Sequence, residues 1–137
     1  MKTEDMLAIR QEIARYSYTF DSGDAEGWAS LFTEDGLWES YPAGATEPGT
    51  RLEGRAAMRS FCAKRFSERR GGLTSAHHQS GIIFDDLTAD TAKVRAMMLL
   101  TIQTPGESAR VYMTGVYEDV WVKTPEGWRI KHRVLRP

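Results

Sequence analysis

The first half of the chain carries apolar residues at helical spacing. One stripe predicts a helix that ends near Gly23, because glycine commonly terminates helices. The residues of this stripe are Met6, Ile9, Ile13, Tyr16 and Phe20. Asp24 can cap a second, short helix that carries Trp28. A third helix is expected between Gly54 and the RRGG sequence at 69–72.

The second half follows the pattern of strands. Four strands are expected, at 75–85, 91–104, 109–123 and 127–135. The turns between them are too short for crossover helices, so neighbouring strands should pair antiparallel. A shorter strand, LWESY at 37–41, should follow the turn EDG at 34–36 and precede a loop rich in Pro and Gly at 42–50. This order predicts an α+β fold in one domain, 1–137, with three N-terminal helices on one face of a curved sheet.

The stretch AMMLLTI, at 96–102, places apolar residues on both faces of its strand. Such a strand needs both faces covered. The helices can cover one face and a second subunit the other, which predicts a homodimer. The alternative is that loops cover the ends of a strand at the centre of a bent sheet.

Composition narrows the class of protein. The chain has 18 basic and 19 acidic residues, for a formal net charge of −1, so we expect no nucleic-acid partner. The lone cysteine, Cys62, cannot form an internal disulfide and fits a reducing compartment. The first ten residues are too acidic for a signal peptide, and the apolar run at 96–100 is far too short to span a bilayer. We therefore expect a cytoplasmic protein with no membrane partner.

Asp21 flanks the apolar stripe at the carbonyl end of the first helix, where the helix dipole disfavours an anion. Partial burial there would raise its pKa and make it a better base. The alternative is ordinary turn chemistry, with the carboxylate bonded to the local backbone of Asp-Ser-Gly-Asp. Tyr16, five residues earlier, could approach the same cavity from another side.

His77 and His78 begin a predicted strand, in which successive side chains point to opposite faces. One imidazole can therefore face the helices and form a proton-transferring pair with a carboxylate. Diverging neighbours make a poor metal pair, and no Cys/His cluster has zinc spacing. The sequence also has no phosphate-binding glycine loop and no serine nucleophile elbow, so we expect neither a metal nor a cofactor.

Four stretches that cover most of the chain carry a family resemblance. They are IARYSYTFDSGDAEGWASLFTEDGLWE, LEGRAAMRSF, SAHHQSGIIFDDLTADTAKV and MTGVYEDVWVKTPEGWRIKHR. In this order they resemble the SnoaL-like branch of the superfamily with the nuclear-transport-factor-2-like fold. That superfamily includes scytalone dehydratase, bile acid 7-alpha-dehydratase and ketosteroid isomerase. The resemblance implies a cone-shaped barrel, in which a strongly curved, mainly antiparallel sheet wraps the helices and leaves a pocket at its open end.

The resemblance also implies roles for individual residues. In the dehydratase-like members, an aspartate at the end of the first helix orients a histidine on a strand, and the histidine removes a proton. Asp21 matches that aspartate, and Tyr16 matches a position that contacts the leaving group in some members. Arg133 matches a position where some relatives place an arginine in the pocket, although a solvated strand arginine is the alternative. Trp38 and Tyr41 are further candidates for substrate binding.

The choice of histidine is open between two arguments. An ungapped match to the family selects His77, with Gly81 where the family usually has asparagine. Simple alternation instead places His78 on the more apolar face, which carries Ile82 and Phe84. We favour His77 because bulges often interrupt alternation, and we keep His78 as a substrate-binding candidate.

Together these features predict a cofactor-independent lyase, such as a dehydratase, or an isomerase. The expected substrate is a small hydrophobic cyclic molecule, such as a polyketide, a steroid or an aromatic catabolite. Asp21 and His77 would form its acid/base dyad, assisted by Tyr16. The alternative is a non-catalytic ligand-binding domain or a small structural subunit of a ring-hydroxylating dioxygenase.

Overall fold

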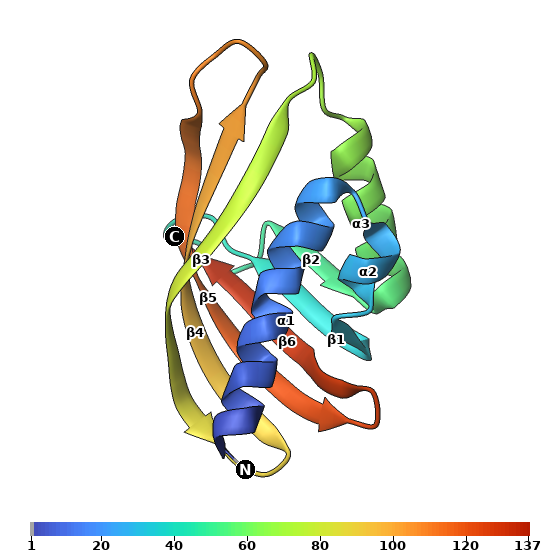
Figure 1. The fold of residues 1–137 in the computed structure, drawn as a ribbon, viewed down its shortest axis with the longest axis vertical. Helices are drawn as coiled ribbons and strands as arrows, with labels where there is room; N and C mark the ends of the chain where they lie inside the picture. Colours follow the sequence, from blue (N-terminus) through green and yellow to red (C-terminus); the bar gives the residue numbers. More distant parts are fainter. Residues whose placement is uncertain (1) are drawn as a thin grey trace.

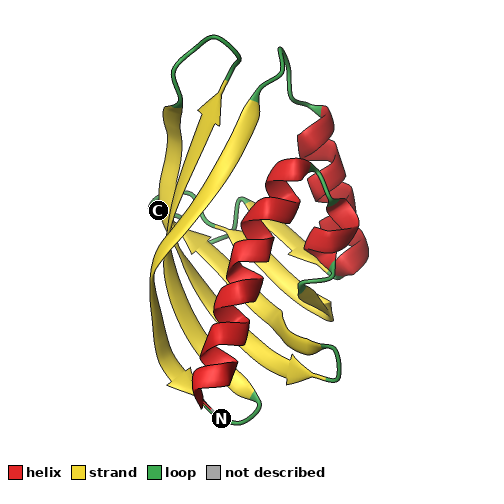
Figure 2. Cartoon of the chain, viewed as in Figure 1, coloured by secondary structure: helices red, strands yellow, loops and turns green. Residues whose placement is uncertain are grey.

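The computed structural model describes residues 2–137. Its helices are α1 (Lys2–Ser22), α2 (Ala25–Ala29) and α3 (Arg55–Ser67). Its strands are β1 (Phe32–Ser40), β2 (Thr50–Glu53), β3 (Thr74–Leu87), β4 (Thr91–Gln103), β5 (Arg110–Thr124) and β6 (Gly127–Arg136). Figure 2 shows that the helices gather on one side of the sheet.

The three predicted helices and the four C-terminal strands are confirmed. The start of β1 was predicted wrongly, because the strand begins at Phe32. Phe32 pairs with Ile130 of β6, and the register of the two strands shifts before Leu37. The EDG sequence is therefore an irregularity within the strand and not a turn before it. The short strand β2 was not expected, and it pairs antiparallel with β1.

The strands form one sheet in the order β2-β1-β6-β5-β4-β3. The β1–β6 pair is parallel and the other neighbours are antiparallel. Figure 1 shows that the sheet curves strongly and that α1 lies along its concave side. The predicted α+β architecture, with helices packed on a curved and mainly antiparallel sheet, is confirmed.

The core lies between the helices and this concave face. The predicted stripe of α1 buries Ile9, Ile13 and Tyr16, while Trp28 of α2 and Trp121 of β5 are completely buried. Burying a large apolar side chain contributes about 1.5–3 kcal/mol, so these buried residues hold α1 against the concave face of the sheet. Within residues 2–137, no helix is both long and apolar enough to cross a membrane.

Strand β4 alternates cleanly up to Met98. Its inward positions are Ala92, Val94, Ala96 and Met98, all of them buried. Met97 and Leu99 lie on the outer face, where they are 55% and 36% exposed. The predicted apolar residues on both faces are thus present, and coverage of the outer face by a second subunit stays a prediction.

Candidate functional site

Asp21 lies in the last turn of α1, and its carboxylate contacts the start of β3. Its Oδ1 lies 2.7 Å from Nδ1 of His77 and accepts a hydrogen bond from the Ser75 hydroxyl at 2.8 Å. Its Oδ2 accepts from the backbone N–H of His77 at 2.8 Å. The alternative of local turn chemistry is wrong for Asp21. Asp24 serves the turn instead, because its carboxylate accepts from the N–H of Gly27 and caps α2.

A bulge in β3 decides which histidine meets Asp21. Ser75, His77 and Gln79 face α1, and the Gln79 amide donates to the carbonyl of Ile13 and to the Ser17 hydroxyl. The register of β3 against β4 then shifts between Ser80 and Ile83. Gly81 lies in this shift with a φ of 59°, a backbone conformation that favours glycine. The strand therefore turns His77 inward even though Ile82 and Phe84 also pack against the core.

Arg69 follows α3 and holds Asp21 and Ser75 in place next to His77. Its guanidinium donates from Nη1 to the backbone carbonyl of Asp21 at 2.8 Å and from Nη2 to the Ser75 hydroxyl at 2.7 Å. Ser75 in turn donates to Asp21, so one chain of hydrogen bonds joins the end of α1, the segment that follows α3 and the start of β3. Neither Arg69 nor Ser75 was identified from the sequence, where RRGG indicated only the end of a helix.

These contacts set the charge of Asp21. Burial raises the pKa of the Asp21 carboxyl, since its side chain is only 16% exposed. The hydrogen bond and charge of His77, with the bonds from the His77 backbone and Ser75, outweigh burial and lower the pKa below its usual value. Asp21 is therefore ionised at neutral pH and can accept a hydrogen bond from Nδ1–H of His77, an arrangement in which Nε2 is the ring nitrogen left for a ligand.

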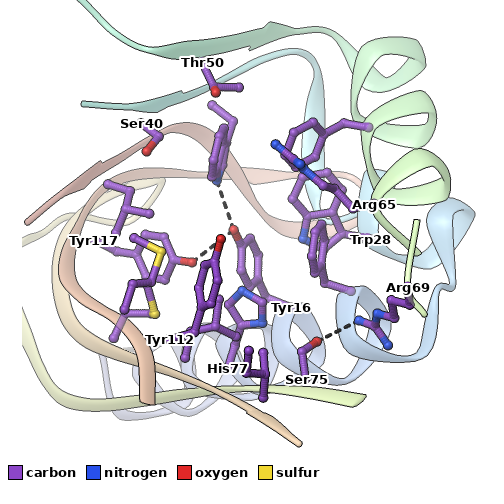
Figure 3. A pocket seen from close by; sticks show the side chains of 18 of the residues that line it. Tyr16, Trp28, Ser40, Thr50, Arg65, Arg69, Ser75, His77, Tyr112 and Tyr117 are labelled. Atoms are coloured by element: carbon purple, nitrogen blue, oxygen red, sulfur yellow. Dashed lines mark hydrogen bonds between the residues drawn. The ribbon is translucent and has the colours of Figure 1, made fainter. Parts of the chain in front are cut away.

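His77 borders a cavity of about 400 Å³ between the helices and the sheet. Figure 3 shows His77, Tyr16 and Tyr117 together on its wall. Aromatic and aliphatic residues make up most of that wall, namely Phe20, Trp28, Trp38, Phe61, Leu73, Met98, Leu100, Ile102, Met113 and Leu135. The cavity is therefore a mainly apolar pocket with a few polar groups, as is usual for small-molecule sites.

Tyr16, Tyr117 and Trp38 form a polar cluster in this wall. The Tyr16 hydroxyl accepts from Nε1 of Trp38 at 3.0 Å and donates weakly to the Tyr117 hydroxyl at 3.4 Å (Figure 3). Burial raises the pKa of Tyr117 well above its usual value, so this phenol stays protonated. Tyr16 and Trp38 thus lie where the sequence placed them, whereas Tyr117 was missed because nothing in VYED distinguishes it from a core tyrosine.

Arg133 is neither solvated nor part of the cavity wall, which corrects both expectations. It is completely buried and makes a bidentate ion pair with Asp119, at 2.8 and 2.7 Å. Its guanidinium carbon lies 4.3 Å from the ring centre of Tyr16 and 3.8 Å from that of Tyr117. Strand alternation turns Arg133 inward, where Asp119 neutralises it behind the two tyrosines. It can support Tyr16 and Tyr117 but cannot touch a ligand directly.

Tyr41 and His78 also lie outside the wall of this cavity. His78 projects from the outer face of the sheet, where its Nε2 lies 3.0 Å from the Thr101 hydroxyl. Tyr41 lines a neighbouring hollow and packs under the guanidinium of Arg136, at 4.4 Å. The structure therefore places neither residue in the wall beside His77: His78 follows an inward residue, and Tyr41 lies just beyond the end of β1 in a hollow that shares Ser40 and Thr50 with the cavity.

Two other chemistries find no support among the described residues. No group of three or more His, Cys, Asp or Glu in residues 2–137 is arranged to hold a metal ion. Burial raises the pKa of the Cys62 thiol to about 11, so the thiol stays protonated at neutral pH. A protonated thiol is a poor nucleophile, and Cys62 acts as a small core residue.

Residues 1–134 match the SnoaL-like domain family. A protein of unknown function from Mycobacterium tuberculosis is 28% identical, with a TM-score of 0.84 that covers 98% of this chain and 72% of that chain. A candidate scytalone dehydratase from Novosphingobium aromaticivorans is 28% identical, with a TM-score of 0.80 over 98% of this chain and 84% of that one. A protein with a nuclear-transport-factor-2-like, cystatin-like fold from the same bacterium is 26% identical, with a TM-score of 0.81 over 98% and 82%. The fold expected from the sequence is confirmed by these likenesses.

Proposed function

Because this chain belongs to the SnoaL-like family, we propose that it is a cofactor-independent lyase, such as a dehydratase, or an isomerase. The observation that carries the proposal is the 2.7 Å contact between Asp21 and His77 at the wall of an apolar cavity. We also propose that the protein acts in the cytoplasm, because its lone cysteine fits a reducing compartment.

His77 is the general base of this proposal. The ionised Asp21 holds the proton on Nδ1, so Nε2 carries a lone pair that can accept a proton from a substrate carbon. Transfer to Nε2 makes an imidazolium, which the Asp21 carboxylate stabilises. The backbone bond from His77 to Asp21 and the bond from Ser75 keep the imidazole ring and the carboxylate in one orientation.

The tyrosine cluster is the second part of the proposed mechanism. The ring centres of Tyr16 and His77 are 6.4 Å apart, so one small ring compound can contact both. Hydroxyl groups at Tyr16 and Tyr117 can donate to a departing hydroxyl or to an oxyanion that develops when the proton leaves. The apolar wall accounts for the proposed substrate class, a small hydrophobic cyclic molecule such as a polyketide, a steroid or an aromatic catabolite.

The test is a screen of cyclic hydroxy-ketones and related ring compounds, without added metal or nucleotide, followed by two variants. A positioned base supplies roughly 10²- to 10⁴-fold of the rate, so His77→Ala should lower turnover by about that factor. His78→Ala is the matched control, because His78 lies on the other face of the same strand and should leave turnover unchanged. Equal activity of wild type and His77→Ala would rule out the mechanism.

The alternative function makes a different prediction for the same protein. A small structural subunit of a ring-hydroxylating dioxygenase would co-purify with a large iron-containing chain and would be inactive in the screen. A ligand-binding domain would bind ring compounds without converting them. Either result would replace the catalytic proposal, although the dyad would then require another explanation.

A further inference from the structure

The charges on the cavity wall have a single sign. The residues of fixed charge in the wall are Arg65 and Arg69, and none of the described residues that line it carries a carboxylate. The whole chain has a formal net charge of −1, so this excess of cations is local to the cavity. Cationic groups on a mainly apolar wall favour an anionic ligand, because opposite charges attract and no carboxylate of the wall competes for them.

The two arginines differ in how much of their hydrogen-bonding capacity is already used. Arg69 is held by the Asp21 carbonyl and the Ser75 hydroxyl. Arg65 makes only a loose contact with Glu68, at 3.8 Å between two exposed side chains. Such exposed pairs contribute little energy, so the Arg65 guanidinium remains available to a stronger partner.

Arg65 is also held against the cavity. Its guanidinium carbon lies 5.1 Å from the ring centre of Phe61, one helical turn earlier on α3, and both residues line the wall. Its side chain is 58% exposed, which places it at the solvent side of the wall and not in the core. Figure 3 shows that Arg65 and His77 approach the cavity from different elements, α3 and β3. Both residues line the same cavity, so a ligand that fills the cavity borders both of them.

We propose that the cavity selects ring compounds that carry a carboxylate, and that Arg65 binds this carboxylate at the mouth. A guanidinium presents two parallel N–H donors that match the two oxygens of a carboxylate. Anchored in this way, the ring lies among the aromatic residues of the wall and presents its other end to His77. The conversion of such an acid rests on the function proposed above, whereas its binding does not.

The experiment uses isothermal titration calorimetry to measure the binding of two compounds of similar size. 2-Naphthoate carries a negative charge, and 2-naphthamide is neutral. Wild-type protein should bind 2-naphthoate about fivefold more tightly than 2-naphthamide. In Arg65→Gln the protein should bind 2-naphthamide more tightly than 2-naphthoate. The carboxylate then loses its partner, and binding still costs the free energy of its desolvation. Affinity for 2-naphthamide should stay within about twofold of wild type.

Two further variants separate a specific contact from a general effect of charge. Lys64→Gln removes one positive charge from the adjacent exposed position of α3, which does not line the cavity, and should preserve the preference for 2-naphthoate. Arg65→Lys keeps the positive charge but lacks the two parallel N–H donors of the guanidinium, so it should retain only part of the preference for 2-naphthoate. Equal affinities in wild type, no measurable binding of 2-naphthoate, or a preference that survives in Arg65→Gln would each overturn the proposal.

The proposed catalytic function can fail independently of this result. His77→Ala should keep the preference for 2-naphthoate while losing turnover. A protein that prefers the acid but converts no ring compound would retain the carboxylate site without the enzyme. A protein that converts neutral ring compounds through His77 but shows no preference for the acid would retain the enzyme without the carboxylate site.

Discussion

At the scale of single residues, the site is built around one ionised carboxylate. Asp21 receives three hydrogen bonds from β3, two of them from His77 and one from Ser75. A carboxylate held by several donors is a poor base itself, because its pKa is lowered. Its chemical value lies in fixing the tautomer of His77 and in stabilising the imidazolium that forms when His77 accepts a proton.

Asp21→Asn should therefore reduce turnover by about 10²-fold or more, although the side chain keeps its shape. Asparagine cannot offset the charge of the imidazolium, and its amide can donate to Nδ1 and impose the wrong tautomer. The measurement is kcat on a substrate identified in the screen. Asp24→Asn is the control, since asparagine caps helices as well as aspartate does and α2 should remain intact.

The lowered pKa of Asp21 also predicts how stability depends on pH. The unfolded chain binds a proton at Asp21 at a higher pH than the folded protein does. This carboxylate therefore contributes stability that is complete above its unfolded pKa of about 3.9 and is lost as the pH falls through the lower folded pKa. Urea denaturation between about pH 3 and 6 should show a free energy of unfolding that decreases toward acid.

In Asp21→Asn this decrease should be shallower. It should not vanish, because the pKa values of Asp5 and Asp85 are also lowered and remain so. Asp35→Asn removes an exposed carboxylate instead and is the control for the loss of one negative charge. Identical slopes in wild type and Asp21→Asn would contradict the assignment of this titration to Asp21.

At the scale of the elements, β5 and β6 are joined by a buried ion pair beneath the cavity. Asp119 and Arg133 face each other in the register of the two strands, with no exposure of either side chain. Asp119 pairs with Nε and Nη2 of Arg133 and also accepts a bond from the Trp121 indole at 3.2 Å, whereas Nη1 of Arg133 is buried without a hydrogen-bond partner. The pair thus fixes the position of the Arg133 guanidinium, against which the rings of Tyr16 and Tyr117 pack.

Arg133→Met should lower the free energy of unfolding by about 3–5 kcal/mol, because it leaves Asp119 buried without its partner. The double variant Asp119→Leu with Arg133→Met should recover most of that loss, since it removes both charges from the core. Urea denaturation of the single and double variants gives the comparison. A single variant as stable as wild type would show that the pair contributes nothing to the fold.

The sequence predicted the elements whose pattern is local and missed those that depend on distant partners. The stripe of α1 and the four C-terminal strands follow from spacing within each segment. The β2 strand is only four residues long and exists because β1 lies beside it. The parallel pairing of β1 with β6 joins segments about a hundred residues apart, so no short-range pattern could indicate it.

The candidate site divides in the same way. Asp21 and His77 could be proposed because a family resemblance supplied the long-range contact that spacing alone does not contain. Arg69 and Tyr117 were missed because their roles depend on residues 48 and 101 positions away. Arg133 was misplaced because arginine is rarely buried, and only its partner Asp119 makes burial possible.

At the scale of the whole molecule, the outer face of the sheet remains the uncovered apolar surface. Met97, Leu99 and Ile83 are exposed there, on the adjacent strands β4 and β3. The helices cover the opposite face, so nothing in the described chain covers this side (Figure 1). Apolar side chains grouped in this way are typical of a surface that another protein covers.

We expect a homodimer formed through this face, with a mass twice the 15.5 kDa of one chain. Light scattering at micromolar concentration measures this directly. Met97→Glu should shift the protein toward the monomer, because it places a charge in the apolar contact. Tyr18→Glu, at an exposed position of α1, should leave the mass unchanged. A wild-type protein that stays monomeric would refute the expectation.

The tryptophans of the cavity have a practical consequence for the search for a ligand. Trp28 and Trp38 line the cavity, whereas Trp121 and Trp128 lie in the core away from it. The Trp38 indole donates to the Tyr16 hydroxyl, so a ligand that binds this hydroxyl changes the environment of the Trp38 indole. Indole emission is sensitive to such changes. The protein therefore carries its own optical reporter of occupancy, and unlabelled compounds can be surveyed with the unmodified chain.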